Sequence, residues 1–391
     1  MRMRLTRRHT PRNFSGAAIL TSLLLFTAFT GSLAAQPQSG GGSDDTLHLV
    51  FTGDIMGHDS QIASALKTGN GSYDYRSCFQ PIAPYIRQAD IAVGNLEVTL
   101  AGPPYKGYPA FSSPDALARA LRETGFDVLV NANNHALDRG KKGLERTLAV
   151  LDTLSFIRAG SYRDTTERRL HYPLILEKNG IRIALLNYTY GTNGIPVTPP
   201  NMVNYIDTAQ IRLDLAKAAT AEPDFTIALM HWGSEYQRKE NAQQRALARL
   251  LFEHGTDAII GSHPHVVQPV TLNGDGTLAV WSMGNFISNQ RKRYTDGGIA
   301  FEMTLAREGD EVMIRDYGYL PVWVYKRSTG NGPAFRLVPA AMDSTASEAL
   351  EIPASDVRAM KLFLTDTREN LPGVRESDWK RVMNQTVNPD D

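Results

Sequence analysis

The sequence predicts an α/β protein in which largely parallel strands are covered by helices. Short apolar runs rich in Val, Ile, Leu and Phe recur without polar alternation, as in strands that are buried on both faces. Segments with helical periodicity separate several of these runs, and most of the runs are followed closely by Asp, Glu, Asn or His. With 391 residues, of which 42% are hydrophobic and 21% charged, the chain is globular rather than disordered or fibrous.

The apolar runs place the strands in chain order. They are residues 47–52, 91–93, 126–130, 181–187, 225–230, 258–260 and 278–281. From Gly298 onward the apolar residues alternate with polar ones, which predicts further strands that return along a sheet.

The helices are predicted from their start signals, stop signals and apolar faces. One begins at residues 113–115, with Ser113 as its cap, and stops at Gly125. A second has its apolar face at residues 144, 148 and 151, and a third ends at residues 254–255. Residues 355–371 are also expected to be helical, and residues 384–391 to fray.

The N-terminus has the composition of a targeting segment. Five arginines precede an apolar stretch of about thirteen residues and a small-residue exit, so residues 1–35 are predicted to be a signal peptide or a signal anchor. Residues 36–45 are rich in Gly and Ser and are predicted to form a flexible linker. The protein is therefore expected to be exported to the periplasm or cell envelope, either after cleavage of this segment or with the segment as a membrane anchor.

Charge and cysteine content exclude several classes of protein. Lys plus Arg and Asp plus Glu both number 41, so the chain lacks a basic footprint, and no nucleic-acid partner is expected. Cys78 is the only cysteine, which excludes an intramolecular disulfide and a thiolate zinc site. It is expected to be a buried small residue.

Polar residues follow the predicted strands at the positions where ligands bind in α/β proteins. In such folds ligands bind beyond the carboxyl ends of the strands, so side chains far apart in sequence are expected to meet at one sheet edge. Imidazole, carboxylate and amide ligands without a thiolate suit Zn, Mn, Fe or Co. The candidates are Asp54, Asn95, Glu97, Asn134, His135, His231, His263, His265 and Asn285.

Several candidates have an alternative structural interpretation. His263-Pro264-His265 is the sharpest signal, because an extended segment points residues i and i+2 to the same side and Pro264 favours that conformation for His263. Asp54 could instead belong to a turn, and Glu97 could cap a helix. His58 could simply open a helix, and Glu235 either borders the site or lies on the surface.

Two further segments have open interpretations. The loop that follows Tyr190 and runs to Asn204 either shapes access to the site or is an ordinary surface loop. The basic residues Arg291, Lys292 and Arg293 form either a solvated turn or a contact for an anionic polymer.

Six motifs in this order resemble the CapA/PgsA capsule-synthesis family, which is associated with bacterial poly-γ-glutamate production. They are Gly-Asp-Ile-Met (53–56), Gly-Asn-Leu-Glu (94–97), Ala-Asn-Asn-His-Ala-Leu-Asp (132–138), His-Trp-Gly-Ser-Glu-Tyr (231–236), Gly-Ser-His-Pro-His-Val-Val-Gln (261–268) and Ser-Met-Gly-Asn-Phe-Ile (282–287). The likeness covers residues 46–300, and residues 301–391 would be a C-terminal extension that packs on the same domain.

The same motifs look like a variant of the calcineurin-like metallophosphoesterases. That resemblance implies a four-layer αββα sandwich, here with C-terminal strands and a helix, and two divalent cations such as Mn, Zn or Fe. It would place Asp54 on the first cation and Glu97 between the two. Asn134 and His231 would bind the second, His263 and His265 would complete the sites, and His135 would be the general acid.

The sequence departs from the phosphoesterase pattern in two motifs. The first has Ile55-Met56 in place of Asp-x-His, with His58 four residues after Asp54, and the second has Asn-Leu-Glu in place of Gly-Asp-x-x-Asp. These departures leave open the number of metals and whether the reaction is that of a phosphoesterase.

The resemblance implies an exported CapA-like protein of capsule or poly-γ-glutamate biosynthesis that acts as a metal-dependent hydrolase of phosphoesters or amides. Its expected partners are an anionic polymer or phosphoester substrate and membrane subunits of capsule synthesis. One alternative is a non-catalytic subunit that binds or exports polymer. Another is a periplasmic phosphatase of the nucleotidase type.

Overall fold

The computed structural model describes residues 45–67, 71–329 and 332–380. The predicted signal segment, nearly all of the predicted linker and the predicted frayed end at residues 384–391 lie outside the described residues. Within those described ranges, no helix has the length and apolar character needed to cross a membrane.

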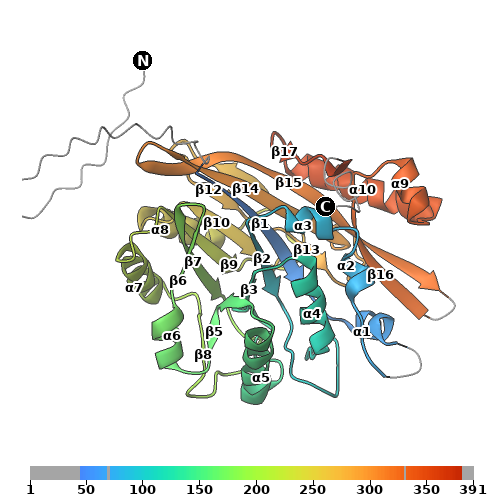
Figure 1. The fold of residues 1–391 in the computed structure, drawn as a ribbon, viewed down its shortest axis with the longest axis horizontal. Coiled ribbons are helices and arrows are strands. Elements are labelled where there is room, and N and C mark those ends of the chain that lie inside the picture. The colour runs from blue at the N-terminus through green and yellow to red at the C-terminus, as the bar shows by residue number, and fades with distance from the viewer. Residues whose placement is uncertain (1–44, 68–70, 330–331, 381–391) are drawn as a thin grey trace, which may run out of the picture. The chain divides into compact units, whose positions relative to one another are not determined.

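Two sheets form the centre of the described chain (Figure 1). The larger has the order β16-β15-β14-β1-β2-β3-β4, with β13 beside β1 and β17 beside β15, and the smaller has the order β11-β12-β10-β9-β7-β6. The larger sheet contains β1 (Thr46–Ile55), β2 (Ile91–Leu96), β3 (Val128–Val130), β4 (Ile157–Ala159), β13 (Asn285–Ile287), β14 (Gly297–Glu308), β15 (Glu311–Thr329), β16 (Gly332–Pro339) and β17 (Arg375–Glu376). The smaller contains β6 (Leu174–Lys178), β7 (Ile181–Thr189), β9 (Phe225–His231), β10 (Ala258–Ser262), β11 (Val270–Leu272) and β12 (Leu278–Val280), and a separate pair joins β5 (Ser161–Tyr162) to β8 (Met202–Val203).

Each sheet has a parallel centre, as the apolar runs predicted. Strands β1 to β4 are parallel, and so are β7, β9, β10 and β12, whereas β6, β11, β14, β15 and β16 pair in the antiparallel sense. The expectation that all the polar strand ends lie on one sheet is wrong, because they are divided between two. Apolar runs look alike in whichever sheet they are buried, so their pattern could not assign them.

Helices cover both outer faces of the sheet pair, which confirms the four-layer arrangement (Figure 1). In β1, Leu49 and Phe51 pack in the cluster that includes the smaller sheet, whereas Val50 packs on the opposite face against α2, α3 and α4. The helices next to the larger sheet are α1 (Asp59–Ala65), α2 (Arg76–Phe79), α3 (Ala83–Arg87), α4 (Asp115–Thr124) and α5 (Gly140–Thr153). The next helices along the chain are α6 (Thr165–His171), α7 (Thr208–Ala219) and α8 (Ala242–Glu253).

Helix α4 ends where the sequence predicted, but it is capped by a different residue. It stops at Gly125, whose φ of 115° lies in the left-handed region, and this confirms the predicted stop. Its N-cap is Pro114, and the buried Ser113 hydroxyl has no hydrogen-bond partner in the part of the chain that the structure describes, so the prediction that Ser113 caps the helix is wrong. Cys78 is buried, as predicted.

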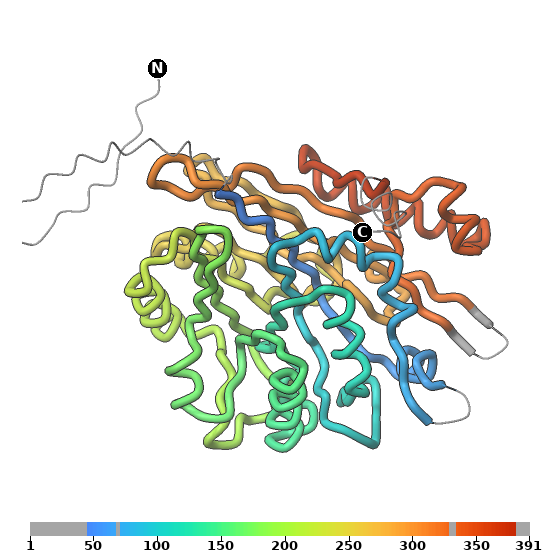
Figure 2. Tube along the Cα trace, in the orientation of Figure 1, coloured from blue at the N-terminus to red at the C-terminus, as the bar shows by residue number. Residues whose placement is uncertain are grey.

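The C-terminal part completes the larger sheet. Strand β14 pairs with β1 along its length although the two are far apart in sequence, and Figure 2 shows the blue and orange segments side by side. The predicted boundary at residue 300 falls inside β14. Helices α9 (Ser344–Ala349) and α10 (Ala354–Asn370) follow, and Met360 and Phe363 pack against Trp323 and Tyr325 of β15.

Candidate metal centre

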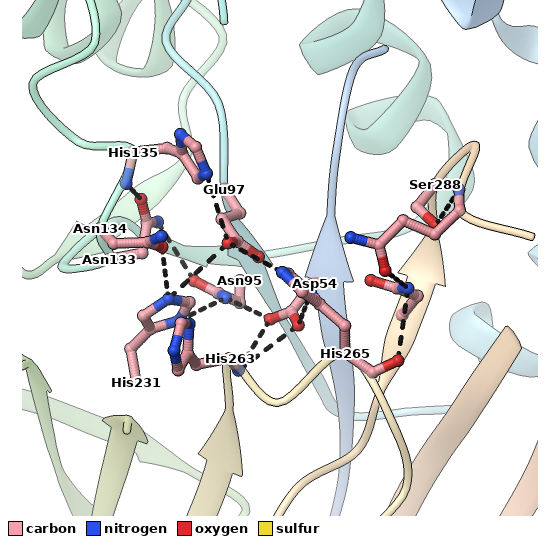
Figure 3. Close-up of polar contacts among 12 residues, drawn as sticks. Asp54, Asn95, Glu97, Asn133, Asn134, His135, His231, His263, His265 and Ser288 are labelled. Carbon is pink, nitrogen blue, oxygen red and sulfur yellow. Dashed lines mark hydrogen bonds and ion pairs between the residues drawn. The ribbon is translucent and has the colours of Figure 1, made fainter. Parts of the chain in front are cut away.

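The strand ends of the two sheets bring seven predicted site residues into one cluster (Figure 3). Asp54 lies at the end of β1, Glu97 directly follows β2, and Asn134 and His135 follow β3. His231 ends β9, and His263 and His265 follow β10. All seven are buried, and in six of them a polar side-chain atom lies within 4.0 Å of a polar side-chain atom of another of the seven. The seventh, His263, reaches Asp54 through its backbone amide.

Asp54 is held by three groups from two other segments, β2 and the loop that follows β10. The Asn95 side-chain amide donates to Asp54 Oδ1 at 2.8 Å, His265 Nδ1 lies 3.0 Å from Oδ2, and the backbone amide of His263 lies 3.3 Å from both oxygens. Burial opposes ionisation of this carboxyl, but the hydrogen bond and charge of His265 lower its pKa below the ordinary value. Asp54 is therefore a fixed carboxylate.

Glu97 is the one acid of the cluster that lacks partners. It is fully buried, and neither carboxylate oxygen has a hydrogen-bond partner among the described residues. Its Oε1 lies 3.7 Å from His231 Nε2 and 4.0 Å from the Nε2 atoms of both His265 and His135, too far for hydrogen bonds. Burial, followed by the charge of Asp54, raises the pKa of Glu97 well above its ordinary value.

Glu97 is shared by two groups of potential metal ligands. Asp54, Glu97 and His231 form one group, and Glu97, His263 and His265 form the other, with the ligand atoms of each group lying within 4.8 Å of one another. Atoms that bind one cation at roughly 2.0–2.3 Å are separated by about 3–4 Å, so these spacings suit a bound ion.

His231 lies between two asparagines. Its Nε2 is 2.7 Å from Asn134 Oδ1, and its Nδ1 is 3.3 Å from Asn95 Nδ2. Burial, and then the neighbouring imidazoles, lower the pKa of His231 well below its ordinary value, and burial lowers that of His263 to about 3. Both rings are therefore in the neutral form that binds metals.

The backbone of the His263-Pro264-His265 segment differs from the prediction. His263 has a φ of 100° and His265 a φ of 58°, so the segment is not extended, and the expectation based on Pro264 is wrong. Both rings are nevertheless buried in the cluster, and His263 Nδ1 has no partner among the described residues. Two left-handed residues without Gly cost on the order of 1–3 kcal/mol each, and such strain is typical of functional sites.

His135 is oriented by a residue that sequence reasoning missed. Its Nδ1 lies 2.8 Å from Asp138 Oδ2, and the same oxygen accepts a hydrogen bond from the backbone amide of Phe111 at 2.7 Å. This contact turns His135 Nε2 toward Glu97 (Figure 3). The signal was the carboxylate three residues after the histidine, which the turn before α5 brings beside it.

The four additional candidates lie in different surroundings. Asn95 is inside the cluster, between Asp54 and His231. Asn285 is buried beside it, where its amide donates to the backbone oxygens of Thr295 and His265. His58 lies outside both ligand groups and accepts from the backbone amide of Asn289. Glu235 is exposed.

Aromatic residues border the cluster on the open side. The centroid of the Tyr190 ring lies 4.5 Å from that of the His263 ring, and the centroid of the Tyr236 ring lies 6.2 Å from that of the His265 ring. Both tyrosines are partly exposed. The loop that follows Tyr190 also contacts the site, because Asn193 Oδ1 accepts from Asn134 Nδ2 at 3.2 Å. This loop therefore borders the site.

A comparison with protein families assigns the chain. The family model described as "Bacterial capsule synthesis protein PGA_cap" matches residues 48–290. The chain belongs to this family. The match covers every strand end of the cluster, and it confirms the resemblance inferred from the six motifs.

Curated relatives carry the same family description. The chain is 29% identical to "PGA biosynthesis protein CapA" of Bacillus subtilis (strain 168), over 73% of this chain and 75% of that protein. It is 28% identical to "Capsule biosynthesis protein CapA" of Bacillus anthracis, over 69% of this chain and 66% of that protein. The family is one of capsule biosynthesis.

Solved structures also show similarity. The calcineurin-like phosphoesterase YfkN from Bacillus subtilis is 15% identical over 81% of this chain and 99% of its own, with a TM-score of 0.46. The NAD nucleotidase of Haemophilus influenzae is 12% identical over 87% of this chain and 66% of its own, also with a TM-score of 0.46.

Proposed function

We propose that this member of the capsule-synthesis family is an exported metal-dependent hydrolase that acts on an anionic polymer, poly-γ-glutamate or a related chain. The observation that carries the proposal is Glu97, a buried carboxylate whose two oxygens have no hydrogen-bond partner among the described residues and which belongs to both groups of potential ligands. A buried carboxylate without a partner is costly, and a cation on each side of Glu97 would remove that cost.

The residues present fit divalent cations. Two carboxylates, neutral imidazoles and the Asn134 amide oxygen form a donor set for Mn, Zn or Fe. Asp54, Glu97 and His231 would hold one cation, and Glu97, His263 and His265 the other. Bound cations supply a Lewis acid and a water of lowered pKa, which serve phosphoester and amide hydrolysis alike.

The other residues of the site orient ligands and move a proton. Asn95 fixes Asp54 and faces His231, while Asn134 faces His231 from the other side. His135 is placed to donate a proton from Nε2 to the leaving group, because Asp138 accepts at Nδ1 and sets the orientation of the ring. His135 is thus the general acid, and Asp138 is its positioning residue.

The alternative is a subunit that holds or exports polymer without cleaving it. The experiment measures metal content, together with turnover of a model phosphodiester, γ-glutamyl amides and nucleotides, for the wild type, Glu97→Gln and the exposed control Glu308→Gln. Turnover of the amides or phosphodiester that needs metal and is lost only in Glu97→Gln supports the hydrolase. Bound metal without turnover contradicts it in favour of the polymer-holding subunit, and a strong preference for nucleotides contradicts it in favour of a nucleotidase.

Export and partners are part of the same proposal. The N-terminal segment would deliver the chain to the cell envelope, where membrane subunits of capsule synthesis are its expected partners. Recovery of the full-length chain from the cytosol only, after expression in its host, would contradict export.

A further inference from the structure

The three basic residues at 291–293, which follow the site strand β13, have separate positions. Arg291 donates to the backbone oxygen of Val324 at 2.7 Å. Arg293 forms a bidentate pair with the buried Asp366 of α10, at 2.8 and 3.0 Å. Both arginines are therefore tied to the scaffold, and they fix the chain on either side of Lys292.

The backbone at Lys292 is fixed as well. Its carbonyl oxygen accepts from the amide of the buried Thr295 at 3.0 Å and from the hydroxyl of the same residue at 2.8 Å. The Thr295 carbonyl in turn accepts from Asn285, the buried amide that also reaches the backbone of His265. The position of Lys292 is thus coupled by hydrogen bonds to the metal-binding loop.

The Lys292 side chain lies on the open border of the cluster. Its Nζ is 5.1 Å from the centre of the Tyr236 ring, and that ring lies 6.2 Å from the ring of His265. The ammonium group and the His265 imidazole are therefore both close to the same tyrosine ring. Lys292 is exposed, and no carboxylate of the described residues forms an ion pair with it.

We propose that Lys292 is a specificity-determining residue that binds a carboxylate of the substrate adjacent to the bond that reacts. This proposal rests on the proposed function, because it takes the anionic polymer as substrate and assigns the residue that recognises its charge. A γ-linked glutamate chain has a free carboxylate on every residue, so a group beside the reacting bond can reach an ammonium on the border of the site. The Tyr236 ring, which lies close to both Lys292 and His265, supplies a flat apolar surface.

Glu235 has the opposite charge on the same border. Burial, and then the charge of the Glu235 carboxylate, raise the pKa of Tyr236 to about 12. The negative charge of Glu235 therefore acts on the same tyrosine that Lys292 contacts. Removing it should favour an anionic ligand, whereas removing Lys292 should disfavour it. These two substitutions therefore have opposite expected signs.

The test measures binding by fluorescence anisotropy, with a labelled five-residue γ-glutamate oligomer and the same oligomer with α-carboxamides. The variants are Lys292→Met, Lys292→Arg, Glu235→Gln and, as a matched control on exposed α10 surface, Lys361→Met. Lys292→Met should weaken binding of the acid oligomer by about two- to five-fold, the upper range of an exposed ion pair, without affecting the amide oligomer. Lys292→Arg should retain binding, Glu235→Gln should strengthen it, and Lys361→Met should leave it unchanged.

The proposal is overturned if Lys292→Met binds the acid oligomer as the wild type does, if Lys361→Met loses as much, or if the wild type binds both oligomers equally. Thermal melting of each variant identifies any loss that is due to misfolding. Metal content and turnover are measured on the same samples, so a failure of the hydrolase proposal is seen separately from the binding difference, which needs no turnover.

Discussion

Replacing Glu97 with Gln separates the cost of the buried carboxylate from its use in binding cations. The substitution keeps the shape of the side chain and removes its charge, at a position where neither oxygen has a partner among the described residues. Without metal, the variant should be at least as stable as the wild type, because no hydrogen bond is lost and the cost of burying an acid whose pKa is raised well above its ordinary value is removed. With metal, it should lack the stabilisation that the wild type gains.

The expected size of that gain follows from linkage. A cation at 100 times its dissociation constant stabilises the folded state by about 2.7 kcal/mol. With an unfolding entropy of about 2 cal/mol/K per residue, a domain of this size should gain roughly 4 °C in Tm for each cation bound.

Thermal melting of the wild type, Glu97→Gln and the exposed control Glu308→Gln, with EDTA and with saturating Mn or Zn, measures these differences. If Glu97→Gln keeps the full metal-dependent shift, or if the metal-free variant is clearly less stable than the metal-free wild type, the role of Glu97 is refuted.

Three further predictions concern the general acid, the pH dependence of stability and the C-terminal helix. His135→Ala should lower turnover by about 10²- to 10⁴-fold, and Asp138→Asn should also lower turnover, with metal content unchanged in both variants. An equal loss of metal, measured by elemental analysis, would argue against these roles. Despite burial, hydrogen bonds from His48, Ser377, Arg375 and Tyr85 lower the pKa of Glu302 to about 2, so its stabilisation is complete above the ordinary value of 4.5 and is lost as pH falls toward 2. The difference in free energy of unfolding between the wild type and Glu302→Gln, measured by urea denaturation, should therefore shrink by about 2–3 kcal/mol over that range, and a difference independent of pH would contradict the linkage. Asn370→Ala removes hydrogen bonds to the backbone oxygens of Val267 (2.7 Å) and Arg238 (3.2 Å). It should lower the free energy of unfolding by about 1–3 kcal/mol and increase amide hydrogen exchange in residues 263–268. Unchanged exchange there would show that α10 does not stabilise the loop.

The residues of the candidate site could be predicted because their position depends on simple physics. A buried run such as the one before Asp54 must be a strand, and a parallel strand of an α/β fold delivers its next polar residue to the ligand-binding edge. This reasoning found Asp54, Glu97, His231 and His265 without knowledge of how the sheets pair.

Other features depend on tertiary contacts that the local sequence does not encode. The left-handed backbone at His263 is held by its amide contact with Asp54, which lies far away in sequence, so the local preference conferred by Pro264 was overridden. The role of Asp138 depends on Phe111, whose backbone amide fixes the carboxylate. The position of α10 beside residues 263–268 required the whole of the larger sheet to be in place.

Anomalous diffraction from crystals soaked in saturating Mn or Zn tests the central claim most directly. We predict two peaks, one on each side of the Glu97 carboxylate, the first contacting Asp54 and His231 and the second contacting His263 and His265. A cluster without any anomalous peak under those conditions, or peaks that do not contact Glu97, would contradict the claim that this carboxylate is buried in order to bind cations.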